Sequence, residues 1–235
     1  MKLRQIAEIL LRRFSVNRRI KIADRSIDLR LSLASQLKYL KKDFDDDIKD
    51  VARRFTEDSD LIFDIGANCG VFSAACLISA HSVRVVAVEP DPVTFKVLES
   101  NLRDYNSIVI NKAVSDTAGT AELLIPNRGR ATSTIVTVGS STQMGGIRSA
   151  IRVETTTVDD LVAEYGPPAL IKVDVEGAEA LVIRGAEKTL TEHSPILHIE
   201  VSPVNMRLVE LIISLGYRCV GQQGKNFTFL PLRKK

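Results

Sequence analysis

Residues 61–73 read Leu-Ile-Phe-Asp-Ile-Gly-Ala-Asn-Cys-Gly-Val-Phe-Ser and carry the most specific signal in the chain. The apolar run 61–65 predicts a buried strand, the Gly66-x-Asn68-x-Gly70 segment predicts a tight turn, and an apolar helix start follows. In open α/β sheets, ligands bind beyond the carboxyl ends of the strands. Because glycine has no Cβ, the backbone of such a turn can approach a ligand closely. We therefore expect a cofactor to lie over this turn.

Similar apolar runs recur along the chain and alternate with segments of helical character. Runs that are apolar on both faces and are joined by long crossovers indicate strands of a parallel sheet covered by helices. The sequence thus predicts a doubly wound α/β domain. The predicted strands are residues 61–65, 83–88, 107–114, 170–175 and 196–201.

Two regions depart from this alternation. Residues 119–126 predict an added strand or hairpin, and residues 127–150, rich in Gly, Ser, Thr and Arg, are either a lid or binding loop or a disordered insert. Near the C-terminus, residues 205–215 have helical spacing. Residues 217–220 and 227–230 then flank a Gly-Gln-Gln-Gly segment, which is typical of a terminal β-hairpin.

The turn also indicates which cofactor it suits. It lacks the Lys-Ser/Thr ending of a P-loop, and Asn68 stands where the dinucleotide motif needs its second glycine. Asp64 at the mouth of the turn would repel a pyrophosphate but can hold a cationic ammonium group. The pattern therefore favours S-adenosyl-L-methionine over NAD.

The ends of the next two strands supply further polar groups. Glu89 ends the second strand, where a carboxylate can accept hydrogen bonds from both ribose hydroxyls; the alternative is a carboxylate that only favours the start of the next helix. Asp116 after the third strand can accept from an adenine amino group, although Ser-Asp-x-x-Gly is also an ordinary turn. The predicted cofactor-binding residues are Asp64, Gly66, Asn68, Gly70, Glu89, Pro90, Ser115 and Asp116.

Taken together, these motifs closely resemble those of the FkbM-type methyltransferases. The match runs from residue 61 to about residue 201 with family-like spacing. The resemblance implies a Rossmann-like class I methyltransferase fold with a seven-stranded sheet whose last strand is antiparallel, and usually O-methylation of a sugar or another natural-product hydroxyl. It is carried by the segments Asp64–Gly70, Glu89–Phe95 with Asn101, Asn111–Gly119, Thr157–Leu161, Ile171–Glu179, Gly185-Ala186 and Glu200.

Methyl transfer to a hydroxyl requires alignment of the acceptor and removal of its proton. The two-residue period of a strand places Lys172, Asp174 and Glu176 on one face, and His198 and Glu200 at a neighbouring edge. We predict Asp174, Glu176, Glu200 and Lys172 as catalytic residues, with Asp174 the first choice for the base.

Simpler interpretations stand beside these roles. His198 is also explained as a core histidine, Lys172 as an ion pair that supports its strand, and Glu179 as a helix-surface charge. Asp174 with Glu200 offers Mg²⁺ only two carboxylates, so no metal site is predicted. The three cysteines, Cys69, Cys76 and Cys219, are expected to be reduced thiols, and no zinc site is indicated.

The charge of this 235-residue chain is uneven. Its net charge is +3, yet residues 1–30 hold nine Lys or Arg against three acidic residues. Ile6, Ile9, Leu10 and Phe14 recur at helical spacing among arginines, so this segment predicts a basic amphipathic helix that either packs on its own domain or contacts anionic lipid or a polyanionic substrate. A second helix is predicted for residues 44–55. We expect a small helical extension over residues 1–60 and the methyltransferase domain over 61–235.

The expected protein is therefore cytoplasmic, because no apolar run reaches the length of a membrane span or a signal peptide. The alternative is a cytoplasmic protein whose N-terminus contacts the inner face of the membrane. The predicted function is S-adenosylmethionine-dependent O-methylation of a sugar, glycolipid or related natural product; the alternatives are an RNA or protein methyltransferase, or a non-catalytic S-adenosylmethionine-binding module. Nucleic acid is disfavoured because aromatic residues make up 5% of the chain and none accompanies Arg128 and Arg130.

Overall fold

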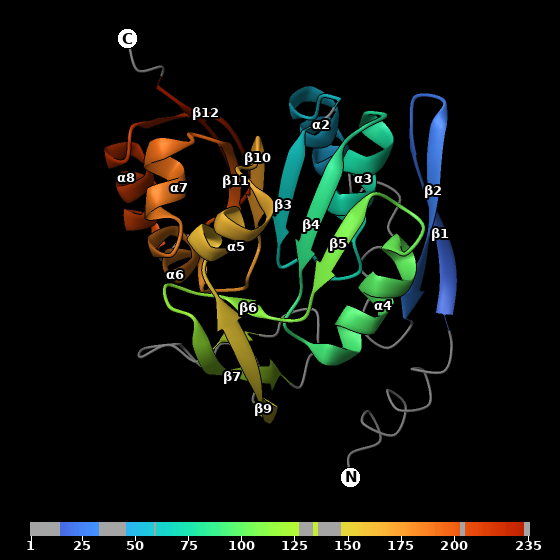
Figure 1. The fold of residues 1–235 in the computed structure, drawn as a ribbon, viewed down its shortest axis with the longest axis horizontal. Helices are drawn as coiled ribbons and strands as arrows, with labels where there is room; N and C mark the ends of the chain where they lie inside the picture. The colour runs from blue at the N-terminus through green and yellow to red at the C-terminus, as the bar shows by residue number, and fades with distance from the viewer. Residues whose placement is uncertain are drawn as a thin grey trace.

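A seven-stranded sheet forms the centre of the molecule (Figure 1). The computed structural model describes residues 15–32, 46–58, 60–126, 134–135, 147–202 and 205–232. The strands lie in the order β12-β13-β11-β10-β3-β4-β5. Their bounds are β3 Leu61–Ile65, β4 Arg84–Val88, β5 Ser107–Ile110, β10 Leu170–Val173, β11 Ile196–Glu200, β12 Tyr217–Gln223 and β13 Asn226–Pro231.

Five strands of this sheet are parallel, and β13 is antiparallel to both of its neighbours, β11 and β12. The predicted fold class and the terminal hairpin are therefore confirmed. The register of the strands also determines which side chains meet at the end of the sheet. Lys172 of β10 lies opposite Asp64 of β3 and His198 of β11, so these three side chains leave neighbouring strands at one level.

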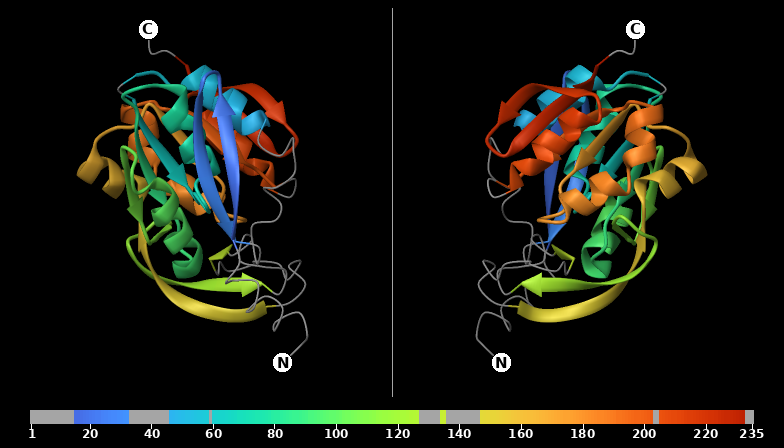
Figure 2. Two further views of the ribbon diagram at one scale, coloured as in Figure 1. Left: turned by 90° about the vertical axis from the view of Figure 1, so that its right-hand side faces the viewer. Right: turned by 90° about the vertical axis from the view of Figure 1, so that its left-hand side faces the viewer.

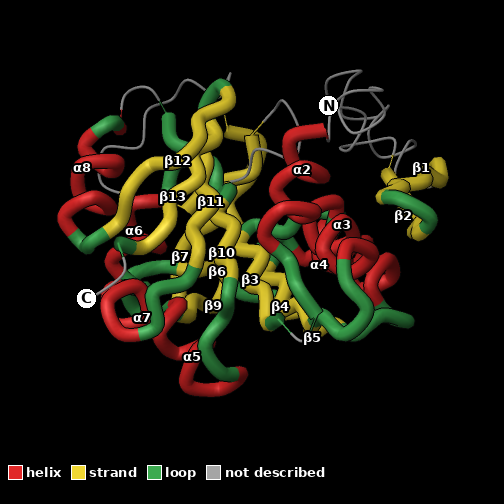
Figure 3. Tube along the Cα trace, turned by 90° about the horizontal axis from the view of Figure 1, so that it is seen from above, coloured by secondary structure: helices red, strands yellow, loops and turns green. Residues whose placement is uncertain are grey.

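Helices cover both faces of the sheet, as viewed from above in Figure 3. Alternate residues of the strands point to opposite layers, as the two-residue period requires. Ile62 belongs to the core under α3 and α4, whereas Phe63 belongs to the core under α5 to α8. The helices are α2 Asp46–Phe55, α3 Val71–Ser79, α4 Pro92–Leu102, α5 Val158–Tyr165, α6 Glu179–Arg184, α7 Glu187–Glu192 and α8 Arg207–Ser214.

The N-terminal extension differs from the helical one that we expected. Its described part contains α2, close to the predicted helix, but also an antiparallel hairpin of β1 (Ser15–Ile22) and β2 (Arg25–Ser32), blue in Figure 2. Its apolar residues alternate with exposed ones, which is the strand period, and they pack into the core shared with α3 and α4. The predicted basic helix over residues 6–14 lies outside the described residues.

A smaller sheet lies beside the central one and has the order β6-β9-β7-β8. The predicted strand 107–114 is divided, because its last two residues form β6 and pair with β9 instead of with β4. Strand β7 coincides with the added strand that we predicted, whereas β9 was missed. Residues 127–133 and 136–146 of the predicted loop, with Arg128 and Arg130, lie outside the described residues. The bounds are β6 Ala113–Val114, β7 Gly119–Pro126, β8 Thr134–Ile135 and β9 Ile147–Thr156.

Two smaller findings concern the cysteines and the helices. The three thiols are free, with Cys69 and Cys76 buried and Cys219 exposed. In the part of the chain that the structure describes, the helices are too short or too polar to cross a membrane.

Candidate functional site

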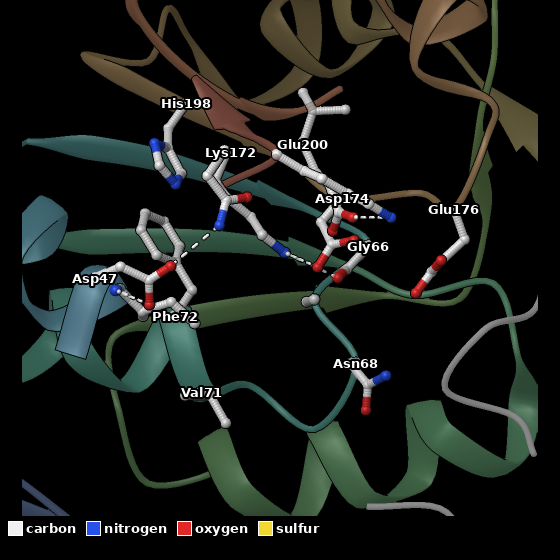
Figure 4. A pocket seen from close by; sticks show the side chains of 15 residues that line it. Asp47, Gly66, Asn68, Val71, Phe72, Lys172, Asp174, Glu176, His198 and Glu200 are labelled. Atoms are coloured by element: carbon white, nitrogen blue, oxygen red, sulfur yellow. Dashed lines mark hydrogen bonds and ion pairs between the residues drawn. The ribbon is translucent and has the colours of Figure 1, made fainter. Parts of the chain in front are cut away.

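A cavity of about 380 Å³ opens at the carboxyl ends of β3, β10 and β11 (Figure 4). Its volume is within the range of small-molecule sites. The segments that line it come from α2, from the glycine turn after β3, from the start of α3, and from the C-terminal hairpin. The lining residues are Asp47, Ile48, Gly66, Ala67, Asn68, Val71, Phe72, Lys172, Val173, Asp174, Glu176, His198, Glu200, Lys225 and Asn226.

The glycine turn, residues 66–70, has a left-handed backbone at three positions. The φ angles are 76° at Gly66, 52° at Asn68 and 88° at Gly70. A Cβ on Gly66 would lie 1.9 Å from the carbonyl oxygen of Asp174, so only glycine fits there. The amides of Gly66 and Ala67 both donate to the carbonyl of Val88. The turn is thus pressed between the ends of β4 and β10.

Lys172 is the central cation of the site. Its buried ammonium lies 3.3 Å from Asp64 Oδ1 and 3.5 Å from Asp174 Oδ2, and it donates to the carbonyl of Gly66 at 3.1 Å. Burial alone would lower the pKa of Lys172, but the two carboxylates outweigh burial and raise it. Lys172 is therefore a permanent cation, and its ion-pair interpretation is the one that the contacts support.

Asp64 is not among the residues that line the cavity, and its predicted contact with an ammonium group of the cofactor stays a prediction. Its side chain is fully buried, and its Oδ2 accepts hydrogen bonds from the amide and hydroxyl of Ser73. Its Oδ1 faces the ammonium of Lys172. A carboxylate enclosed in this way holds the protein's own cation, because a buried charge needs a partner.

Glu89 lies directly behind the turn. Its Oε2 accepts from the amide of Asn68 at 2.9 Å and its Oε1 accepts from the amide of Asp91 at 3.0 Å. Burial raises the pKa of Glu89 to about 7. The carbonyls of Glu89 and Pro90 both accept from the side chain of Asn111. Glu89 therefore shapes the turn, while each of its oxygens keeps a second lone pair for a ligand.

Asp174 and Glu200 bring two carboxylates to one side of the cavity. Burial and the neighbouring charge of Asp174 raise the pKa of Glu200, and Lys225, 3.5 Å from Glu200, opposes this only partly. Asp174 is ion-paired with Lys172, 3.5 Å away. Glu176 follows on the same loop, at a left-handed backbone position, and also lines the cavity. The predicted catalytic residues are thus brought together.

His198 is a buried, hydrogen-bonded histidine, as its simplest interpretation expects, whereas Glu179 differs from its own. His198 lines the cavity and shares a hydrogen bond with Thr228 at 3.0 Å; burial, together with the charge of Lys172, lowers its pKa to about 4, so it is neutral at neutral pH. Glu179 is not a surface charge. It is 3% exposed, accepts from the amide of Gly177, and has a pKa raised by burial.

Ser115 and Asp116 do not line this cavity. The hydroxyl of Ser115 donates to Asp116, whose other oxygen accepts from the guanidinium of Arg184 at 3.2 Å. The carbonyl of Ser115 presses on Gly185, where a Cβ would lie 2.1 Å from it. Their segment is fixed against α6, and the structure does not bring them to the cavity that Gly66 and Asn68 line.

The sequence did not predict the contact between α2 and β13 at the cavity. Asn226 donates to the carboxylate of Asp47 at 3.0 Å, which links α2 to the C-terminal hairpin across the cavity mouth. The acidic start of α2 was the only available signal, because 179 residues separate the two partners. Among the described residues, no group of three or more His, Cys, Asp or Glu side chains is arranged to hold a metal ion.

Comparison with known proteins places this geometry in a family. The model of the methyltransferase FkbM domain matches residues 64–219. A relative from Streptomyces tacrolimicus, 31-O-demethyl-FK506 methyltransferase FkbM, is 27% identical over 198 residues, which are 72% of this chain and 76% of that protein. The hexuronic acid methyltransferase AglP of Haloferax volcanii is 30% identical over 139 residues, or 57% of this chain and 53% of that protein.

Solved structures show the same fold. The methyltransferase FkbM of Methylobacillus flagellatus superimposes with a TM-score of 0.54 at 20% identity, covering 74% of this chain and 44% of that one. A 16S rRNA methyltransferase (RsmC) from T. thermophilus gives a TM-score of 0.56 at 12% identity, covering 93% of this chain and 51% of that one. The chain therefore spans about half the length of these two solved proteins.

Proposed function

The chain belongs to the FkbM methyltransferase family, and on this premise we propose that it is an S-adenosylmethionine-dependent O-methyltransferase that acts on a hydroxyl of a sugar, glycolipid or related natural product. The observation that carries the proposal is the position of two carboxylates, Asp174 and Glu200, in the same cavity as the glycine turn, beside the fixed cation of Lys172.

The turn suits a donor that approaches the backbone. Gly66, Ala67 and Asn68 of the turn line the cavity, and Glu89 behind them has lone pairs for ribose hydroxyls. The carboxylates that line the cavity, and not Asp64, would then hold the ammonium group of the donor. When it is bound, S-adenosylmethionine supplies an electrophilic methyl group. The protein has to orient the acceptor oxygen and to take its proton.

Glu200 is the better proton acceptor of the carboxylate pair. A carboxylate with a raised pKa binds a proton more readily, and burial together with the charge of Asp174 raises the pKa of Glu200. Asp174 is ion-paired with the buried Lys172, whereas the lysine beside Glu200, Lys225, is exposed. We therefore assign the general base to Glu200 and the orientation of the acceptor hydroxyl to Asp174. With the donor bound, the acceptor hydroxyl would give its proton to Glu200 as its oxygen forms a bond to the methyl carbon. The bond between methyl carbon and sulfur would break at the same time, and its electron pair would stay on the sulfur.

The lining of the cavity supports a polyhydroxy acceptor. Carboxylates accept hydrogen bonds, and the amides of Asn68 and Asn226 both donate and accept, which matches hydroxyl groups that do the same. The names of the two relatives support this proposal, because one acts on 31-O-demethyl-FK506 and the other on a hexuronic acid.

Two measurements test the proposal. Calorimetric titration with S-adenosylmethionine should show binding to the wild-type protein. Methyl-labelled S-adenosylmethionine should then label a purified glycan or glycolipid fraction, and Glu200→Gln should abolish labelling while binding persists. Glu154→Gln, at an exposed ion pair with Lys112 in the smaller sheet, is the matched control and should leave both unchanged.

Other outcomes would replace the proposal. Labelling of RNA that weakens steeply with salt would indicate an RNA methyltransferase, because phosphate contacts dominate such binding. Labelling confined to protein would indicate a protein methyltransferase. Binding of the donor without transfer to any acceptor class would indicate a non-catalytic module.

The place of action is also a proposal. We infer a cytoplasmic protein whose basic N-terminal residues, 1–30, contact an anionic membrane surface near a lipid-linked acceptor, on the support of their excess of Lys and Arg. Co-sedimentation with vesicles of anionic and of neutral lipids tests this. Binding to the anionic vesicles alone, removed by salt, is the expected result, and equal binding to both would contradict it.

A further inference from the structure

Asn101 connects three parts of the molecule through one buried side chain. It lies near the end of α4 and is 6% exposed. Its Oδ1 accepts from the amide of Arg30 in β2 at 2.8 Å, and its Nδ2 donates to the carbonyl of Arg30 at 3.0 Å. The same Nδ2 donates to the carbonyl of Cys69, inside the glycine turn, at 2.8 Å. A single amide thus joins α4, the N-terminal hairpin and the turn.

The turn depends on such outside contacts for its shape. Asn68 and Gly70, on either side of Cys69, both have left-handed backbones. Asparagine tolerates this conformation better than most residues with a side chain, but less well than glycine. Glu89 holds the amide of Asn68 on one side, and Asn101 holds the carbonyl of Cys69 on the other. Loss of either contact would let the turn relax away from the form that lines the cavity.

The hairpin also holds the far end of the helix that follows the turn. Arg25 donates to the carbonyls of Ala80 and Leu77, where α3 ends, at 2.6 and 3.2 Å. A cation at a helix C-terminus is favourable, because the last carbonyls lack partners within the helix. Between these points the buried Ile20 and Leu29 of the hairpin belong to the core that α3 shares. The hairpin is therefore fixed at both ends of α3.

We propose that Asn101 is a positioning residue for methyl-donor binding, and that through it the β1–β2 hairpin sets the conformation of the glycine turn. This inference rests on the proposed function, because it assumes that S-adenosylmethionine lies over the turn. A ligand that needs the ordered turn stabilises everything that orders it, so donor binding and hairpin docking favour each other reciprocally.

The first test compares two asparagine variants. Asn101→Ala should weaken S-adenosylmethionine binding by about tenfold, as expected for loss of hydrogen bonds that order the site. Asn106→Ala is the control, because it removes a side-chain hydrogen bond to the carbonyl of Val83, which precedes β4 at the amino-terminal end of the strand, away from the turn. It should bind the donor as the wild type does. Asn101→Asp keeps the acceptor for the amide of Arg30 but loses the hydrogen bonds that Nδ2 donates to the carbonyls of Arg30 and Cys69, so it should resemble Asn101→Ala.

The second test uses the wild-type protein and does not depend on a variant that folds well. Hydrogen exchange at the Arg30 amide should slow severalfold when S-adenosylmethionine is added. Unchanged exchange at Arg30, or equal donor affinity of the Asn101→Ala and Asn106→Ala proteins, would overturn the inference while leaving the proposed function intact. A wild-type protein that binds no S-adenosylmethionine would instead overturn the proposed function.

Discussion

The ammonium of Lys172 lies 3.3 Å from Oδ1 of Asp64, and the two side chains are 10% and 0% exposed. They are opposite each other on the neighbouring strands β10 and β3. Removal of one member of a buried pair leaves the other charge without compensation.

Lys172→Met should therefore lower the free energy of unfolding by about 3–5 kcal/mol, measured by urea denaturation. The double variant Lys172→Met with Asp64→Asn should recover part of this loss, because no buried charge is then left alone. Arg53→Ala, at an exposed pair with Asp50, should change stability little. A Lys172→Met protein as stable as the wild type would contradict the importance of this pair.

The glycine turn offers a steric prediction. Gly66→Ala places a Cβ 1.9 Å from the carbonyl oxygen of Asp174 and adds the cost of a left-handed alanine, so stability and donor binding should both fall strongly. Gly216→Ala has the same backbone cost, with φ at 91°, but its Cβ meets nothing within 4 Å. It should lose only about 1–2 kcal/mol in thermal or urea denaturation. Equal losses in the two variants would show that the contact with Asp174 is unimportant.

Glu89 predicts a pH dependence of stability. Its pKa is raised to about 7 in the folded protein from 4.5, so between these values the folded state binds more protons than the unfolded state. The stability that Glu89 contributes is therefore present below about pH 4.5 and is lost as the pH rises to about 7. Relative to Glu89→Gln, the wild type should lose on the order of 3 kcal/mol across this window.

The comparison with Glu89→Gln is needed because His198 acts in the opposite direction. Its pKa is lowered from 6.5 to about 4, so the folded protein loses stability as the pH falls through that range. Urea denaturation of both proteins across the window separates the two effects, since His198 is common to them. A constant difference between wild type and Glu89→Gln at every pH would show that Glu89 does not titrate as described.

Glu200 predicts a change in the rate of methyl transfer. Glu200→Gln should lower kcat by about 10² to 10⁴-fold, as expected for loss of a general base, and should leave the Kd for S-adenosylmethionine unchanged. The acid limb of the wild-type profile of kcat/KM against pH should lie above the ordinary range of a glutamate, because burial and Asp174 raise the pKa of Glu200. A Glu200→Gln enzyme with the wild-type acid limb would exclude Glu200 as the base.

Local sequence patterns were sufficient to predict most of the fold. The apolar run 61–65 coincides with β3, and the Gly-x-Asn-x-Gly segment forms the turn at its end. Strands that are apolar on both faces are typical of a parallel sheet buried between helix layers, so their direction follows from the pattern. Their order in the sheet is shown only by the structure. The hairpin β1–β2 escaped notice because its alternating residues stand next to a basic segment whose helical spacing suggested another structure.

The site depended more on contacts between distant residues. Asp47 and Asn226 meet across 179 residues, and Lys172 reaches the carbonyl of Gly66 across 106. No periodicity encodes such pairs, since they depend on how loops at the edge of the sheet pack together. The same holds for Asn101, whose spacing in a family-like motif gave no indication that it joins the hairpin to the turn.

The sequence by itself therefore predicted a site at the carboxyl edge of β3 and β10, where the structure has its cavity, and three of the acidic residues that line it, Asp174, Glu176 and Glu200. Only the tertiary structure decided which carboxylate is buried and which lines the cavity. Asp64 and Asp174 are both paired with Lys172, but Asp64 is sealed beneath the ammonium and Asp174 is left at the cavity. The reason is desolvation, because a lysine buried between strands must be neutralised by the carboxylate that the register places opposite it.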